Sequence, residues 1–355
     1  MIFFIPGRPG MILQLLRRLP DEPYKGSALY TTAREEAALF SPWFIPLLIL
    51  ADALLGDPPA WPHLVRLMGR AIEVLEGMLR RWFTTPSGLV LAGGLLWLLV
   101  VGGTLWAGGL VLAGAGWLWP PLAGLIGLVM AFQCLAAGQL CREARRVVQV
   151  LEAGDLAGAR ARLGMIVGRQ TEGLSPTAIR RALVETVAEN LSDGVVAPLF
   201  YLALFGPLGA LAYKAVNTLD SMVGYRNQRY LHLGRVPARL DDAANWLPAR
   251  LTALFTIPAA ALCGLDAAGA RRVLAADHAA HKSPNAGWPE AAYAGALGLK
   301  LGGPNLYHGE LVEKPWINPA GRDPEPGDVA LALGLMWWVT ALAGIFCLVL
   351  ALILA

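Results

Sequence analysis

The uncharged stretch "LAGGLLWLLVVGGTLWAGGLVLAGAGWLWPPLAGLIGLVMAFQ" (residues 91–133) decides the fold class of this chain. It lies inside a longer run, from Trp82 to Cys141, that contains no Asp, Glu, Lys or Arg. A transmembrane helix needs about 20 apolar residues, so the run holds two spans joined by a turn at "WLWPPLAG" (residues 117–124). Trp117 and Trp119 suit the interfacial belt of a membrane. The run predicts a membrane hairpin.

Further apolar segments extend this prediction along the chain. The tail from Val329 to Ala355 has no charged side chain and predicts a third span. Residues 42–51 and 251–265 are apolar but short, and "FGPLG" (205–209) interrupts the apolar residues 194–213. Such segments are tolerated at membrane depth where they are buried in protein or line a cavity. We predict an all-α, polytopic integral membrane helical protein with short or broken apolar segments and helical cytoplasmic loops.

Composition agrees with a membrane protein. The chain is 56% hydrophobic and 15% charged, where a soluble domain has about 25% charged residues. The formal net charge is +3 without a basic run, which argues against a nucleic-acid partner. We expect residues 1–41 to be a poorly ordered extension, in which Met11 is a second candidate start, and residues 42–355 to form a single membrane-embedded catalytic domain.

The charges of the loops indicate the orientation. Residues 142–193 carry eight arginines and residues 57–81 carry four. The predicted hairpin places both loops on one side, and the positive-inside rule makes that side cytoplasmic. We expect a multi-pass protein of the cell (inner) membrane whose main polar loops are cytoplasmic.

Acidic residues collect at the start of one broken apolar segment, in "ETVAENLSDG" (185–194). Glu185 and Glu189 are four apart and share a helix face, and Asp193 is expected to close that helix before Gly194. A solvated acidic face is one interpretation. The adjoining apolar segment favours the other, in which the carboxylates belong to a functional site.

A second polar cluster follows the same segment. Lys214, Asn217 and Asp220 are three apart and lie along one helix face. Ionisable groups at membrane depth are candidates for a functional site, although an ion pair of Lys214 with Asp220 or Glu189 that only fixes packing is equally consistent. Guanidinium groups suit phosphates and carboxylates, so we expect substrate contacts from the segment that follows: Arg226, Asn227 and Arg229.

A third cluster, Asp241, Asp242 and Asn245, precedes another apolar segment. Oxygen ligands of this kind suit Mg²⁺ held together with a substrate phosphate, and helix N-capping is the alternative. Because all three clusters lie at apolar boundaries, we predict that they form one site. The expected catalytic residues are Glu185, Glu189, Asp193, Lys214, Asn217 and Asp220, and the expected metal ligands are Asp241, Asp242 and Asn245.

Two loops complete the candidate set. "GDPPAWPHLVRLMGR" (56–70) and "SPNAGWPEAAYAGALGLKLGGPN" (283–305) combine rigid turns with polar residues, and ordinary turn chemistry is the alternative explanation. His278 and His281 are not expected to bind a metal. P-loop, Rossmann and nucleophile-elbow motifs are absent from the sequence. The expected substrate-binding residues of the two loops are Asp57, His63, Arg66, Arg70, Asn285, Trp288 and Glu290.

These two loop motifs, together with residues 185–227 and "RLDDAANWLPARLTAL" (239–254), resemble the adenosylcobinamide-phosphate synthase family of cobalamin biosynthesis. The resemblance covers residues 45–355. It implies a membrane ligase that joins adenosylcobyric acid, a corrinoid substrate, to (R)-1-amino-2-propanol phosphate with consumption of ATP. The product is adenosylcobinamide phosphate. The lipid bilayer and other membrane enzymes of the late pathway are the further partners that we expect.

The implied chemistry assigns hypothetical roles to the residues. Amide formation needs an activated acyl group, Mg²⁺, cations for the phosphates and a base for the amine. Glu185, Glu189 and Asp193 can supply the base or metal ligands, and Lys214 can polarise an acyl phosphate. Two other classes remain open: an intramembrane Mg-dependent prenyltransferase-like enzyme, and a non-enzymatic transporter or regulator on the same scaffold.

Overall fold

The computed structural model describes residues 41–57, 63–307 and 310–354. These residues belong to one compact unit, and the expected N-terminal extension lies outside them apart from residue 41. The helices are α3 (Phe44–Leu55), α4 (Leu64–Trp82), α5 (Pro86–Leu118), α6 (Pro120–Phe132), α7 (Ala137–Glu152), α8 (Leu156–Leu163), α9 (Pro176–Leu191), α10 (Ala197–Val223), α11 (Arg235–Ala244), α12 (Trp246–Leu262), α13 (Ala267–Asp277), α14 (Gly287–Leu297) and α15 (Asp328–Leu354).

Strands form only short ribbons in the described part of the chain. β1 (Leu301–Gly302) pairs with β4 (Trp316–Ile317), and β2 (Asn305–Tyr307) pairs with β3 (Glu310–Val312), each in antiparallel register. The all-α prediction is therefore confirmed.

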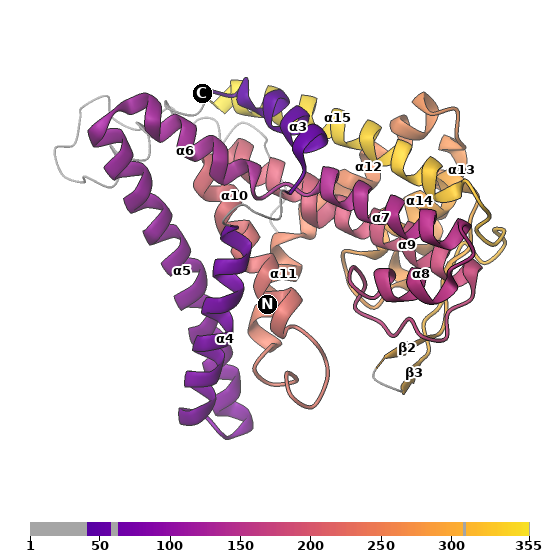
Figure 1. The fold of residues 1–355 in the computed structure, drawn as a ribbon, viewed down its shortest axis with the longest axis horizontal. Helices are drawn as coiled ribbons and strands as arrows, with labels where there is room; N and C mark the ends of the chain where they lie inside the picture. Colours follow the sequence, from indigo (N-terminus) through magenta and orange to yellow (C-terminus); the bar gives the residue numbers. More distant parts are fainter. Residues whose placement is uncertain (1–40, 58–62, 308–309, 355) are drawn as a thin grey trace, which may run out of the picture. The chain divides into compact units, whose positions relative to one another are not determined.

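The predicted hairpin is present. α5 begins at Pro86, and the hydroxyl of Thr85 caps it by accepting from the backbone N–H of Gly88 at 3.1 Å. Trp119 separates α5 from α6, which begins with two prolines that need no amide donor there. α4 lies alongside α5 (Figure 1).

Four helical stretches of the described residues are long and apolar enough to cross a membrane: Pro86–Leu118, Pro120–Glu152, Pro176–Val223 and Asp328–Leu354. α3 and α12 are apolar but shorter, with 12 and 17 residues. These stretches confirm the prediction of an integral membrane protein with short apolar segments.

The longest stretch, Pro176–Val223, contains two irregularities. The expected helix end at Asp193 is wrong, because the chain continues through a π-helical turn, Ser192–Val196, directly into α10. The carbonyl of Gly194 in this turn accepts from the amide of Ala136 at 3.0 Å, so a neighbouring segment satisfies a backbone group that the wider turn exposes. Gly206 (φ 65°, ψ −163°), followed by Pro207, breaks α10 as predicted.

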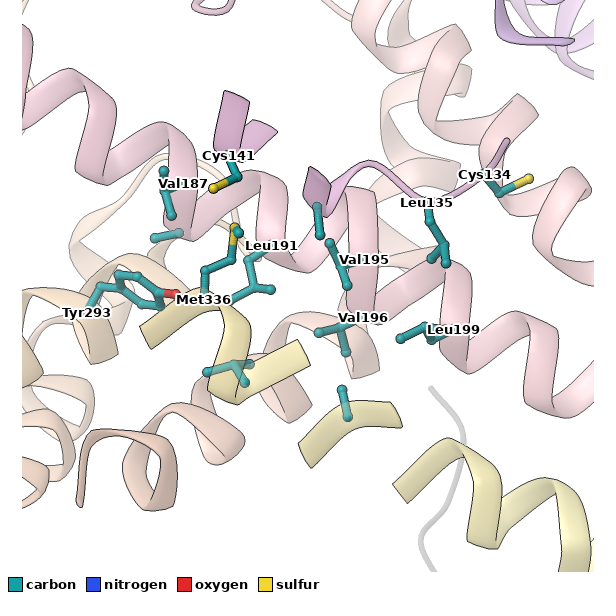
Figure 2. Close-up of a cluster of buried hydrophobic side chains, with 14 of the residues drawn as sticks. Cys134, Leu135, Cys141, Val187, Leu191, Val195, Val196, Leu199, Tyr293 and Met336 are labelled. Carbon is teal, nitrogen blue, oxygen red and sulfur yellow. The ribbon is translucent and has the colours of Figure 1, made fainter. Parts of the chain in front are cut away.

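The apolar core surrounds this stretch. Figure 2 shows side chains of α9, the π-helical turn and α10 packed against Tyr293 of α14 and Met336 of α15. Three cysteines, Cys134, Cys141 and Cys347, are free and buried as small apolar residues. This packing fixes α9, the turn and α10 as one frame, and that frame carries most of the predicted polar site.

Candidate functional site

Carboxylates from several helices converge around α9 and the π-helical turn. Asp193 is close enough to Asp241, Glu189, Asp220 and Lys214 to interact with them electrostatically. The remaining carboxylates join this group through Asp241 and Glu189. We call it the acidic site: Glu185, Glu189, Asp193, Asp220, Asp241, Asp242 and Glu290. The acidic site thus contains residues from each of the three polar clusters of the sequence.

Glu185 is held rigidly on one side of the acidic site. Its Oε2 pairs with Nη2 of Arg169 at 2.5 Å, and its Oε1 accepts from the amide of Gly302 at 2.7 Å. The side chains of Glu185 and Arg169 are only 11% and 9% exposed. Both carboxylate oxygens therefore have a donor, so Glu185 orders the loop before α9 and the β1 strand.

Glu189 lies one turn further along the same helix, in a different environment. Glu189 and its neighbour Asn190 lie at the surface of the protein, whereas the residues preceding them in α9 are buried. Arg169 and Lys314 act on Glu189 electrostatically as the nearby cations, and Glu185 as the nearby anion. The Glu189 side chain therefore lies at the protein surface with two cations nearby, unlike the buried Glu185.

A hydrogen-bonded chain links α10 to α11. The hydroxyl of Tyr213 donates to Oδ1 of Asn245 at 2.7 Å, and Nδ2 of Asn245 donates to Oδ2 of Asp241 at 3.0 Å. Asn245 stands between α11 and α12 without a side-chain cap hydrogen bond, so N-capping does not account for it. The other oxygen of Asp241 is buried without a hydrogen-bond partner.

This environment perturbs Asp241. Burial, followed by repulsion from Asp220, raises the pKa of Asp241 to about 7. The hydrogen bond from Asn245 to the carboxylate acts in the opposite direction. The orphaned oxygen of Asp241 thus needs a proton or a cation.

Among the residues described, no group of three or more His, Cys, Asp or Glu side chains is arranged to hold a metal ion. The orphaned oxygen of Asp241 beside Asp242 and Asp220 fits a Mg²⁺ ion that arrives with a substrate phosphate, since Mg²⁺ usually takes only one or two carboxylates from the protein.

Lys214 is half-buried beside Asp193. In the described part of the chain no carboxylate oxygen lies within 4.0 Å of its ammonium group, so the alternative of a fixed pair with Asp220 or Glu189 is not formed. Asn217 and Asp220 follow on the same helix, α10. The Lys214 charge remains available within the acidic site.

Residues of the 283–305 loop border the site. Nδ2 of Asn285 donates to the carbonyl of Asp242 at 2.8 Å. The Arg250 guanidinium lies 4.5 Å from the ring centroid of Trp288. Arg226 is exposed and acts electrostatically on Asp242.

Glu290 and His281 face each other where burial shifts the pKa of both groups. Burial, with Glu185 and Glu189 nearby, raises the pKa of Glu290 well above its ordinary value. Burial and the positive Lys314 lower the pKa of His281 to about 4. Their side chains approach to 3.9 Å, and both pKa shifts favour the uncharged forms.

Other predicted residues lie away from the acidic site. Asp57 and His63 pair with each other, Arg66 lines a separate cavity, and Arg70 is exposed on α4. Arg229 contacts Glu76 of α4 at 3.2 Å.

Asn227 also has a local role, because its Oδ1 accepts from the amide of Tyr230 at 3.0 Å. Sequence reasoning did not identify Arg169, Tyr213, Arg250 or Lys314. Tyr213 and Arg250 lie inside two of the quoted motifs but belong to none of the three polar clusters, and Arg169 and Lys314 lie outside those motifs.

Comparison with known proteins matches the chain to one family model, described as "CobD/Cbib protein", over residues 46–336. The chain is 50% identical over 297 residues to the "Cobalamin biosynthesis protein CobD" of Klebsiella pneumoniae subsp. pneumoniae, covering 83% of this chain and 92% of that protein. It is 47% identical over 292 residues to the "Cobalamin biosynthesis protein CbiB" of Salmonella typhimurium, covering 82% and 92%. No solved structure matches the chain. By its family model and its relatives alike, the chain belongs to the CobD/Cbib protein family.

Proposed function

We propose that this protein works in cobalamin biosynthesis as a membrane-bound adenosylcobinamide-phosphate synthase. It joins the free propionate of adenosylcobyric acid to the amine of (R)-1-amino-2-propanol phosphate. The names of its relatives support the pathway. The observation that carries the reaction is the convergence, in one place, of an exposed carboxylate, an unpaired lysine and a carboxylate oxygen without a partner.

The reaction needs both an activated acid and a deprotonated amine. A propionate oxygen takes the γ-phosphoryl group of ATP, and ADP leaves. The amine nitrogen then forms a bond to the acyl carbon, the carbon–oxygen bond breaks, and orthophosphate departs with its electron pair. The nitrogen loses protons to a base as the amide forms. Mg²⁺ bound to ATP supplies neutralisation of phosphate charge.

We assign these tasks to different residues by their surroundings. Glu189 is the base, because it is the glutamate of α9 whose side chain lies at the protein surface. Lys214 stabilises negative charge on the acyl phosphate, because no carboxylate holds its ammonium group in a pair. Asp241 and Asp242, with Asp220, are placed to hold the Mg²⁺-bound phosphates. Glu185 is a positioning residue, because Arg169 and Gly302 occupy both of its oxygens.

The membrane position fits the substrates. We place the protein in the cell inner membrane with its main polar loops on the cytoplasmic side, where ATP is available. The arginine-rich loops at 57–81 and 142–193 support this orientation. Neighbouring membrane enzymes of the late pathway are partners that can exchange the corrinoid laterally.

The test uses detergent-purified protein with adenosylcobyric acid, aminopropanol phosphate and Mg-ATP, and follows the corrinoid by mass spectrometry. We expect a mass gain that matches the amide, with ADP formed in equal amount. Replacing Glu189→Gln should lower kcat by about 10²–10⁴-fold, the usual contribution of a general base. Glu152→Gln is the matched control, because Glu152 is exposed on α7 outside the acidic site.

Folded protein that forms no amide with all three substrates would overturn the proposed reaction. Full activity of the Glu189→Gln variant would overturn the assignment of the base and leave the reaction standing. ADP release without a corrinoid product would identify an ATPase activity and contradict the ligase.

A further inference from the structure

A polar cavity has a lining that includes no residue of the acidic site. It has a volume of about 380 Å³, in the range of small-molecule sites. It is located where α3 ends, α4 begins and α7 makes its first turns. We call it the arginine pocket, and its lining residues are Leu55, Asp57, Arg66, Gln139, Arg142, Glu143 and Arg146.

Arg142 has an unusual position in this pocket. Its Nη2 atom is buried and has no hydrogen-bond partner. The guanidinium group lies against the backbone of Gly56, where a Cβ atom would overlap it. Gly56 also has a backbone φ of 51°, which residues other than glycine rarely adopt. The local backbone thus leaves space for a guanidinium group, and leaving its donor unsatisfied carries a free-energy cost.

The carboxylates of the pocket are already engaged. Asp57 pairs with His63. Glu143 accepts from Nε2 of Gln139 at 2.9 Å and from Nη1 of Arg146 at 2.6 Å. Two carboxylates face three arginines, so the lining carries a net positive charge.

Nearby Asp52 does not neutralise Arg142 directly. Its Oδ2 accepts from the amide of Gly138 at 2.8 Å, at the start of α7. In the described part of the chain no carboxylate oxygen lies within 4.0 Å of the Arg142 guanidinium. Asp52 therefore acts on Arg142 only through space.

We propose that the arginine pocket binds the phosphate group of a soluble phosphate ester, with Arg142 as the principal contact and Arg66 and Arg146 at the rim. Arginine suits this ligand because its planar guanidinium can donate two hydrogen bonds to one phosphate. The acidic site repels the same dianion. A phosphate group bound in the arginine pocket is thereby kept away from the carboxylates of the acidic site.

The backbone connects the two sites. Ala136 immediately precedes α7, whose first turns line the arginine pocket, and its amide donates to the carbonyl of Gly194 at 3.0 Å. Gly194 follows Asp193 of the acidic site. The helix whose residues line the arginine pocket is thus joined at its start to the π-helical turn that carries Asp193. The identity of the pocket's ligand as the amino-alcohol phosphate rests on the proposed function, whereas phosphate binding does not.

The experiment measures binding by titration calorimetry with the full-length protein in nanodiscs of neutral lipid. The probes are inorganic phosphate, 1-amino-2-propanol phosphate and ATP, each added separately. Arg142→Met should weaken phosphate-ester binding by at least about tenfold, the change expected when one charge-assisted hydrogen bond is lost. Arg146→Met provides a second variant if Arg142→Met does not fold. Arg145→Met is the matched control, because Arg145 is exposed on the same helix and does not line the pocket.

The outcomes separate this proposal from the proposed reaction. Binding that falls in the pocket variants and stays within about twofold in the control supports the pocket, even if no amide is ever formed. Preference for the amino-alcohol phosphate over ATP identifies the ligand. Equal affinity in all variants would overturn the proposal. A second set of nanodiscs contains anionic lipid. If the pocket binds anionic lipid but none of the soluble phosphates, the occupant is a lipid headgroup and the proposal is overturned.

Discussion

Protonation of His281 should destabilise the folded protein as the pH falls. The His281 side chain is 16% exposed, and its Nδ1 accepts from the amide of Ser283 at 3.0 Å. Burial and the positive Lys314 lower its pKa from 6.5 to about 4. The partner on α14, Glu290, has a pKa raised well above its ordinary value, chiefly by burial, which favours its uncharged form. Glu290 is therefore a poor counter-ion for the imidazolium.

The sign and size follow from proton linkage. Between pH 6.5 and 4 the unfolded chain binds a proton at His281 that the folded protein does not. The contribution of His281 to the free energy of unfolding is thus fully present above pH 6.5 and is lost as the pH falls toward 4. Lowering the pH from 7 to 4.5 should cost about 2.4 kcal/mol through this residue. At about 2 °C per kcal/mol for a large domain, the melting temperature should fall by roughly 5 °C.

The assay compares thermal unfolding in detergent at pH 7 and pH 4.5, followed by the fluorescence of the 12 tryptophans. His281→Asn keeps an acceptor for the Ser283 amide but has no titratable group. Its drop in melting temperature should be about 5 °C smaller than that of the unmodified protein. His232→Asn is the control and should behave like the unmodified protein. An equal pH dependence in the His281→Asn and unmodified proteins would refute the reasoning.

Three further predictions concern packing and polar contacts. Arg169→Met should destabilise the fold by about 3 kcal/mol, because it leaves the buried carboxylate of Glu185 without its charged partner. The double variant with Glu185→Gln should recover part of that loss. Denaturant midpoints of the unmodified protein, the two single variants and the double variant measure the coupling. Gly93→Val should lower the melting temperature or abolish folding, because a Cβ atom at this position would collide with a backbone carbonyl packed against α5; normal expression and melting would contradict this contact. Tyr213→Phe should cost about 1–2 kcal/mol, because it removes the 2.7 Å donor to buried Asn245, and a melting temperature equal to that of the unmodified protein would show that water replaces the hydroxyl.

Local chemistry explains why much of the fold could be predicted. The uncharged run around the α5–α6 hairpin, the charge-free tail that forms α15 and the break at Gly206 are properties of contiguous residues. Ser175 and Pro176 likewise begin α9 as the N-terminal pattern predicts, with the Ser175 hydroxyl accepting from the amide of Ala178 at 3.2 Å. Each of these signals acts within one or two turns of the chain.

The candidate site was predictable only in part. Residues at apolar boundaries indicated which carboxylates gather, and the structure places those of α9, α10 and α11 together. Helical spacing treated Glu185 and Glu189 as equivalent, whereas Arg169 and the Gly302 amide bind the carboxylate of Glu185 and Glu189 lies at the protein surface. Arg229 was assigned to substrate by its type, but Glu76 holds it. Spacing cannot reveal a partner more than 100 residues away.

The sequence by itself determined that the chain enters a membrane, where its long helices lie, and which polar clusters border them, because hydropathy and helical periodicity are read from neighbouring residues. Tertiary structure alone decided which carboxylates are neutralised, which oxygen of Asp241 has no partner, and that Arg142 lies over Gly56 in a pocket. Burial and the approach of charges from distant segments set these properties. They depend on how the helices pack, and packing is a property of the whole chain.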